Sequence, residues 1–338
     1  MSFNRLAPED FVVSSDSITA TLWSEGAVTL TSFNTSSVQE AGSSGNFYLN
    51  IFQTASTDAS AAVQFAIAYG NKYGSGSSFY NNAVIGTSPT KTTYGQYQNL
   101  ILGDENSDFL FGGVSSSDFW VISVDRTRYK ESLFPGSFTL ELSGSTNLIT
   151  LTDDSQVASS IVFNEAGRVF QLVSGSQGTV YTGTGVTSDG YSPSSGSYGW
   201  LLPDIGTIIL NPTALSASIC LAPSKSYNSD GLNYRALFNA INGSTAKSFS
   251  LNSQETISSD YIFIRARNAE FNYSENPSFI SGSTGEVLYD SFINAPQTYI
   301  TTIGLYNDTN ELLAVAKLSR PLLKDFTKEA LIRIKLDF

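Results

Sequence analysis

Hydrophobic and polar residues alternate along much of this chain, and the clearest run is EALIRIKLDF (329–338). Every even position in it is apolar, from Ala330 to Phe338, whereas most odd positions carry charge. A period of two is typical of a strand with one buried and one solvent-facing side. We therefore expect a strand in a C-terminal sheet, next to the apolar run 311–319.

Similar runs of β-branched and aromatic residues recur upstream and are separated by clusters of Gly, Ser, Asn and Asp. The strands expected in the first part are 18–23, 27–33, 46–52, 62–70, 118–126 and 137–144. Helical periodicity is confined to 233–242 and 93–103. The sequence thus predicts a mostly β protein of antiparallel β-sandwich or barrel domains with few short helices.

The pattern also suggests where the chain divides. We expect an N-terminal β-rich domain over 1–245, in which 145–245 is a candidate inserted subdomain. Six strands expected within 246–338, including GEVLYDSF (285–292) and a hairpin around NDTN, indicate a small C-terminal sandwich.

Composition favours a protein that meets other proteins. Charged residues are only 14% of the 338 residues, so much of the polar surface must be neutral, and neutral groups cost less to desolvate than ions. The net charge is −12, which excludes nucleic acid as an expected partner.

The chain contains no histidine and one cysteine, Cys220. Ser-His-Asp and Cys-His catalysis, histidine-ligated zinc and disulfides within one chain are therefore excluded. Cys220 lies in the apolar run SASICLAP, where we expect a buried side chain in a strand. We expect no cofactor and no metal.

Carboxylates are the remaining candidates for acid–base chemistry. Asp153–Asp154 and Asp104–Glu105 are adjacent in sequence, whereas a glycosidase needs two carboxyl groups facing each other across a cleft. A carboxylate-dependent glycan hydrolase stays an alternative. GDENSDF (103–109) resembles a calcium loop but lacks the glycine and glutamate of an EF-hand, so weak calcium binding is a second alternative.

Two groups of residues are candidates for an interface. Arg126, Arg128 and Lys130 form a basic strip on an acidic chain, either solvated, paired within the chain or facing an acidic partner. A Ser/Gly-rich loop at 186–199 is expected to present exposed aromatics, which suit either sugars or protein partners. These aromatics are Tyr191, Tyr198 and Trp200.

The N-terminus has no basic segment followed by an apolar core, and no run approaches the length of a membrane span. We expect a protein made in a cytoplasm, with no membrane partner.

Two stretches, SPTKTTYGQ…FTLEL (88–142) and TYITTIGLY…IRIKLDF (298–338), resemble virion proteins of contractile-tailed phages, notably the T4-like phages of cyanobacteria. Similar context extends over 268–279. The resemblance carries no catalytic motif. It implies a tail or baseplate structural protein, present in many copies and located in the virion.

We therefore expect a structural baseplate component without enzymatic activity, which forms homo-oligomers and binds other tail proteins. The alternatives are a receptor-binding tail protein that recognises host glycans and the hydrolase described above.

Overall fold

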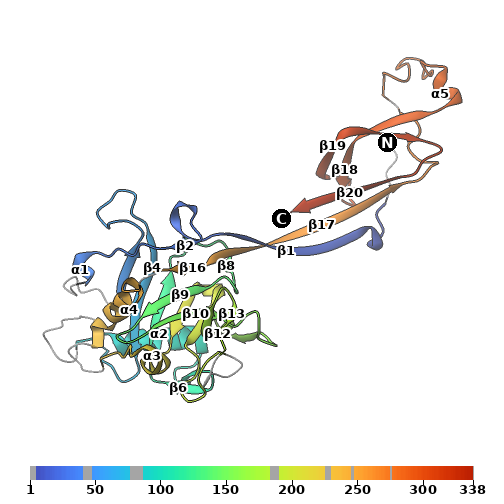
Figure 1. Ribbon diagram of the computed structural model, residues 1–338. Coiled ribbons are helices and arrows are strands. Elements are labelled where there is room, and N and C mark those ends of the chain that lie inside the picture. Colours follow the sequence, from blue (N-terminus) through green and yellow to red (C-terminus); the bar gives the residue numbers. More distant parts are fainter. Residues whose placement is uncertain are drawn as a thin grey trace. The chain divides into compact units, whose positions relative to one another are not determined.

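The computed structural model describes residues 5–40, 48–76, 87–182, 190–224, 230–244, 247–274 and 276–337 (Figure 1). The chain forms two compact units. The central unit is Ile18–Glu255, and the terminal unit combines Met1–Ser17 with Thr256–Phe338. The two chain ends thus belong to one unit, although the sequence predicts separate domains over 1–245 and 246–338.

The helices are α1 (Ser37–Glu40), α2 (Thr90–Leu102), α3 (Pro212–Ile219), α4 (Asn233–Asn242) and α5 (Ser291–Asn294). The strands up to residue 153 are β1 (Phe11–Thr21), β2 (Thr29–Leu30), β3 (Tyr48–Phe52), β4 (Val63–Asn71), β5 (Phe109–Phe111), β6 (Val114–Ser116), β7 (Asp118–Val124), β8 (Ser132–Leu133), β9 (Thr139–Ser143) and β10 (Leu148–Asp153). Those that follow are β11 (Val162–Asn164), β12 (Gly167–Ser176), β13 (Thr179–Val180), β14 (Gly199–Leu202), β15 (Thr207–Leu210), β16 (Phe249–Ser250), β17 (Asn252–Ala266), β18 (Gln297–Tyr306), β19 (Leu312–Asp325) and β20 (Ala330–Asp337).

A 12-stranded sheet dominates the central unit, with the order β2-β16-β9-β10-β12-β14-β15-β7-β4-β3 and with β11 and β13 paired to β12. The strand pairs described in it are antiparallel, and it curls into a half-barrel. The prediction of a mostly β protein with antiparallel sheets and few short helices is confirmed.

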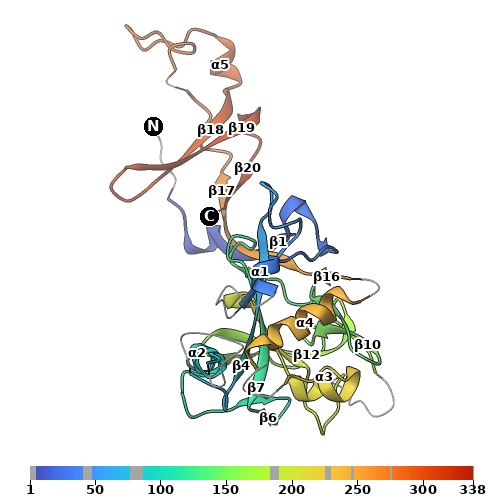
Figure 2. The same cartoon turned by 90° about the vertical axis from the view of Figure 1, so that its left-hand side faces the viewer.

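Strand β7 of this sheet is buried on both faces. Trp120 and Ile122 of β7 join a large hydrophobic cluster with α3 and α4, whereas Phe119 and Val121 join a second cluster with α2 and β5. Figure 2 shows α2 on one side of β4 and β7 and α3 and α4 on the other. This two-sided burial explains why β7 reads as a continuous apolar run rather than an alternating one.

The outer edge of β3 is closed by side chains and loop backbone. The side-chain oxygen of Gln39 accepts from the Asn50 amide at 3.3 Å, and the backbones of Asn34 and Phe52 exchange two hydrogen bonds. These contacts occupy backbone groups that would otherwise be free to pair with another strand.

Local periodicity in the sequence predicted the bounds of two helices well. Helix α4 covers the predicted residues 233–242, and α2 begins three residues before the predicted range and ends at Leu102. The prediction of a strand around Cys220 is wrong, because the residues before it form α3 and Cys220 ends that helix. The Asn211 side chain caps α3 by accepting from the Thr213 amide, and Cys220 ends it in a left-handed conformation with an exposed side chain.

The terminal unit contains β20, and its alternation is confirmed: Ile332 and Ile334 are buried, whereas Leu331 is 70% exposed. Its expected neighbour is wrong. β20 pairs antiparallel with β17, with Ile334 opposite Ile262, and not with residues 311–319. Phe338 lies outside the described residues.

The hairpin around NDTN is confirmed as β18–β19, a two-stranded sheet of its own. The strand expected at 285–292 is wrong, because an isolated bridge at Val287 and the short helix α5 occupy this range. None of the described helices is long and apolar enough to cross a membrane.

Candidate functional site

The basic strip follows β7 on a surface loop. The guanidinium of Arg126 donates to the backbone oxygens of Tyr129 and Lys130 at 2.8 and 2.6 Å and lies 4.6 Å from the centre of the Tyr129 ring. Arg128 donates to the Thr127 hydroxyl, and Lys130 is exposed. The structure thus keeps the three cations on one loop, where Arg126 has a role in holding that loop together.

The loop aromatics do not behave as expected. Tyr198 and Trp200 are 9% and 8% exposed, so the prediction that they project from a loop is wrong. Trp200 belongs to β14, packs 5.2 Å from the ring of Phe111 and donates to the Gln171 side chain. Tyr191 is half-buried against the larger hydrophobic cluster. Of these three aromatics, only Tyr191 retains a partly exposed surface.

The Asp153–Asp154 pair supports local backbone structure. Both oxygens of Asp153 accept from the Gly136 amide at 2.9 Å, and Asp154 accepts from the Gln171 amide at 2.9 Å. Burial raises the pKa of Asp153, while the backbone amides of Gly136 and Ser155, which donate to its carboxylate, oppose the rise. Both carboxylates therefore accept hydrogen bonds from the backbone of neighbouring strands and turns, which accounts for their presence in the fold.

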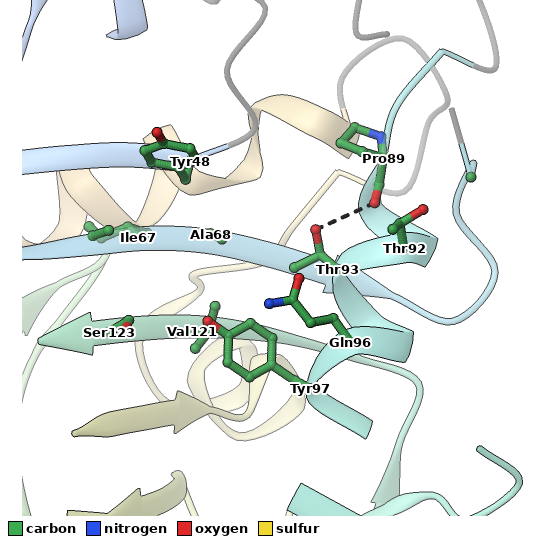
Figure 3. Close-up of a pocket in the computed structure, with 12 residues that line it drawn as sticks. Tyr48, Ile67, Ala68, Pro89, Thr92, Thr93, Gln96, Tyr97, Val121 and Ser123 are labelled. Atoms are coloured by element: carbon green, nitrogen blue, oxygen red, sulfur yellow. Dashed lines mark hydrogen bonds between the residues drawn. The ribbon is translucent and has the colours of Figure 1, made fainter. Parts of the chain in front are cut away.

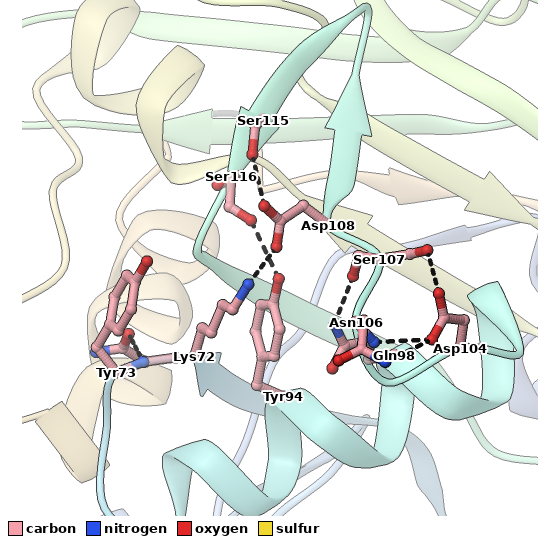
Figure 4. Close-up of polar contacts among 11 residues, drawn as sticks. Lys72, Tyr73, Tyr94, Gln98, Asp104, Asn106, Ser107, Asp108, Ser115 and Ser116 are labelled. Atoms are coloured by element: carbon pink, nitrogen blue, oxygen red, sulfur yellow. Dashed lines mark hydrogen bonds and ion pairs between the residues drawn. The ribbon is translucent and has the colours of Figure 1, made fainter.

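The loop 104–108 is held partly by its own side chains and partly by Lys72 and Ser115 (Figure 4). Asp104 accepts from the Asn106 amide and the Ser107 hydroxyl, and these bonds lower its pKa. Asp108 forms an ion pair with Lys72 at 2.6 Å and accepts from Ser115. No cluster of three potential metal ligands occurs among the described residues.

A buried polar cluster lies near the start of α2, and the sequence did not predict it. Asp230 is 1% exposed and accepts from the hydroxyls of Ser88 and Thr90 at 2.5 and 2.7 Å. Tyr69 donates to Asp118 at 2.8 Å, and burial together with both carboxylates raises the pKa of Tyr69 far above its ordinary value. Residues 88 and 230 are 142 positions apart, so no local pattern could reveal this contact.

An open cavity of about 630 Å³ lies between α2 and the outer face of β4 and β7 (Figure 3). Small residues, including Ala66 and Ala68, form part of its wall, and Tyr48, Gln96 and Tyr97 are the larger polar side chains around it. Its described lining contains no ionisable carboxylate, lysine or arginine. The arrangement suits a neutral ligand and offers no acid–base pair.

A scan of the chain against models of protein families finds no match, and searches of curated proteins and of solved structures also find none.

Proposed function

We propose that this protein is a structural component of a contractile phage tail, specifically of the baseplate, and that it works through contacts with other proteins. The resemblance of 88–142 and 298–338 to tail proteins of T4-like cyanobacterial phages supports this proposal.

The observation that carries the proposal is the exposed apolar surface of the terminal unit. Both hydrophobic core clusters of the described residues lie entirely in the central unit. Large side chains of the terminal unit are exposed instead, among them Val13 at 64%, Ile293 at 72% and Leu313 at 68%. A unit that leaves large apolar side chains exposed is suited to packing against other proteins, because such contacts remove that surface from water.

The geometry of the candidate site favours this function over hydrolysis. Asp104 and Asp153, the carboxylates considered for catalysis, are held by local donors in separate parts of the chain. Neither lines the open cavity, whose described lining is uncharged. Assembly requires no such pair.

A cryo-electron microscopy reconstruction of the whole particle would test the proposal. We expect this chain at the base of the tail, in several symmetry-related copies, with at least about 1,000 Å² buried at each contact. Particles that lack the chain, or that carry it as an isolated decoration with small contacts, would contradict the baseplate function.

A second candidate function is binding of a host glycan in the cavity beside α2. Tyr48 is 44% exposed at its rim, and Gln96 supplies an amide, which together resemble the aromatic and hydrogen-bonding groups used for neutral sugars. A glycan array probed with wild-type protein and with Tyr48→Ala tests this candidate. Signal that is lost in the variant would support it, and a blank array would remove it.

A further inference from the structure

The β18–β19 hairpin cannot owe its stability to its own two strands. It forms a separate two-stranded sheet, and an isolated hairpin is at best marginally stable in water. Most residues of both strands are exposed or half-buried. Its base is anchored, because the ammonium group of the buried Lys324 donates to Asn268 and Asn272. The part between this anchor and the turn needs further contacts.

One face of the hairpin carries an apolar surface close to the turn. Gly304 lies opposite Val315, and a side chain at Gly304 would collide with the ring of Tyr306 and approach Leu312. The glycine thus lets Tyr306 and Leu312 pack over it. Tyr306, Leu312 and Val315 are nevertheless 41%, 53% and 58% exposed. Each of these three side chains thus keeps a large part of its surface accessible to solvent.

Charges of opposite sign flank this apolar face along the strand. Asp308 and Glu311 lie at the turn, whereas Lys317 and Arg320 are exposed farther along β19. No described carboxylate forms an ion pair with Lys317 or Arg320. At about 3.3 Å per residue, Glu311 and Lys317 are roughly 20 Å apart along the strand, with the apolar residues between them.

This order of charges is complementary to itself under two-fold rotation. A two-fold axis that lies in the plane of the interface, perpendicular to the strands, places the two apolar faces against each other and reverses the strand direction of the second copy. The acidic turn of one copy then meets the basic segment of the other. An isologous interface requires this property, because the same surface must serve as both partners.

We propose that two copies of this chain pair through their β18–β19 hairpins, with Tyr306, Leu312 and Val315 at the centre. Lys317 and Arg320 of each copy face Asp308 and Glu311 of the other. The inference deepens the proposed assembly function and rests on it, since it specifies which surface joins two copies.

Two variants with complementary changes of charge test the pairing. The first variant is Lys317→Glu with Arg320→Glu. The second is Asp308→Lys with Glu311→Gln, because glutamine retains the oxygen that accepts from Asn307. We expect sedimentation velocity to show dimers for the wild type, monomers for each variant alone, and dimers again when the variants are mixed. Restored dimers also establish that both variants are folded.

A matched pair of valines tests the apolar centre. Val315→Glu should abolish the dimer, whereas Val162→Glu, at a position 55% exposed in the central unit against 58% for Val315, should leave it intact. The inference would be overturned if the wild-type protein stayed monomeric over a 100-fold range of protein concentration. It would also be overturned if the mixture of the two charge variants stayed monomeric.

The outcomes separate the hairpin pairing from the baseplate proposal. A chain present in the particle whose hairpins do not pair would overturn the pairing alone. Hairpin-dependent dimers of a chain that is absent from the tail would overturn the baseplate function alone.

Discussion

Ile334 of β20 lies directly opposite Ile262 of β17, and both side chains are nearly buried, at 6% and 5% exposure. This contact lies on the apolar face shared by the two strands, whereas Leu331 on the other face of β20 is 70% exposed. The pairing joins residues 72 positions apart and places the final strand within a sheet.

Replacing Ile334 by alanine should therefore destabilise the terminal unit by about 2–5 kcal/mol, the usual range for removing a buried aliphatic side chain. Leu331→Ala deletes a side chain of the same size from the exposed face of the same strand, so we expect a change below about 0.5 kcal/mol. Urea denaturation followed by hydrogen exchange of β17 and β20 measures both. Equal effects of the two substitutions would contradict the observed burial.

The ammonium group of Lys324 is fully buried and donates to Asn268 O, Asn272 Oδ1 and Asp325 O at 3.0, 2.9 and 2.8 Å. Lys324→Met should leave these acceptors unsatisfied and lower the free energy of unfolding by about 1–3 kcal/mol. Lys328→Met is the control, because the Lys328 side chain is exposed and its ion pair with Asp325 is long, at 3.7 Å. Thermal melts in which both variants match the wild type would contradict this role of Lys324.

Arg168 and Asp204 should make the central unit sensitive to acid. Burial disfavours the charge on Asp204, but hydrogen bonds and the positive charge of Arg168 outweigh it and lower the pKa of Asp204 below 3.8. A carboxylate whose pKa is lowered by folding stabilises the folded state when the pH is above its ordinary pKa. This stabilisation is lost as the pH falls through the pKa of the folded state. Gly167 has φ +100°, and a side chain there would collide with Asp204.

We therefore expect Asp204→Asn to be less stable than the wild type at pH 7, with the difference shrinking as pH falls below about 3.8. Urea unfolding at pH 7, 4 and 3 measures this convergence. Glu105→Gln is the control, because Glu105 is an exposed carboxylate of the same unit. A difference that stays constant over this range would exclude a contribution from ionisation of Asp204.

The Cys220 thiol is exposed at the end of α3, although Thr146 lies 3.4 Å from its sulfur. We expect the folded protein to react with a thiol reagent such as 5,5′-dithiobis(2-nitrobenzoate), with one thiol modified per chain. A thiol that reacts only after addition of urea would place Cys220 in the interior, as the sequence had suggested.

We expect no hydrolysis of peptidoglycan or polysaccharide by the purified protein, because the candidate carboxylates are engaged in local structure. Assays for reducing-sugar release over a range of pH values test this expectation. Reproducible turnover that disappears in Asp153→Asn or Asp104→Asn would reinstate the hydrolase alternative.

Local periodicity in the sequence determined which residues form several elements and which of their faces are apolar. In α4, Leu237, Phe238 and Ile241 follow helical spacing and are buried, and in β20 the alternation of two predicts the burial of Ile332 and Ile334. Such a pattern involves only residues within one or two helical turns, or within a few positions of one strand. It can therefore be read from the sequence without knowledge of the tertiary contacts.

The tertiary structure decided which elements meet and which surfaces stay open. Nothing in β20 specifies pairing with β17 rather than β19, because its alternating pattern suits either neighbour. Trp200 lies next to a Ser/Gly-rich loop in sequence, yet β5 and β7 bring Phe109 and Phe119 to the same hydrophobic cluster and bury it. Such contacts join distant segments, and only the folded chain brings them together.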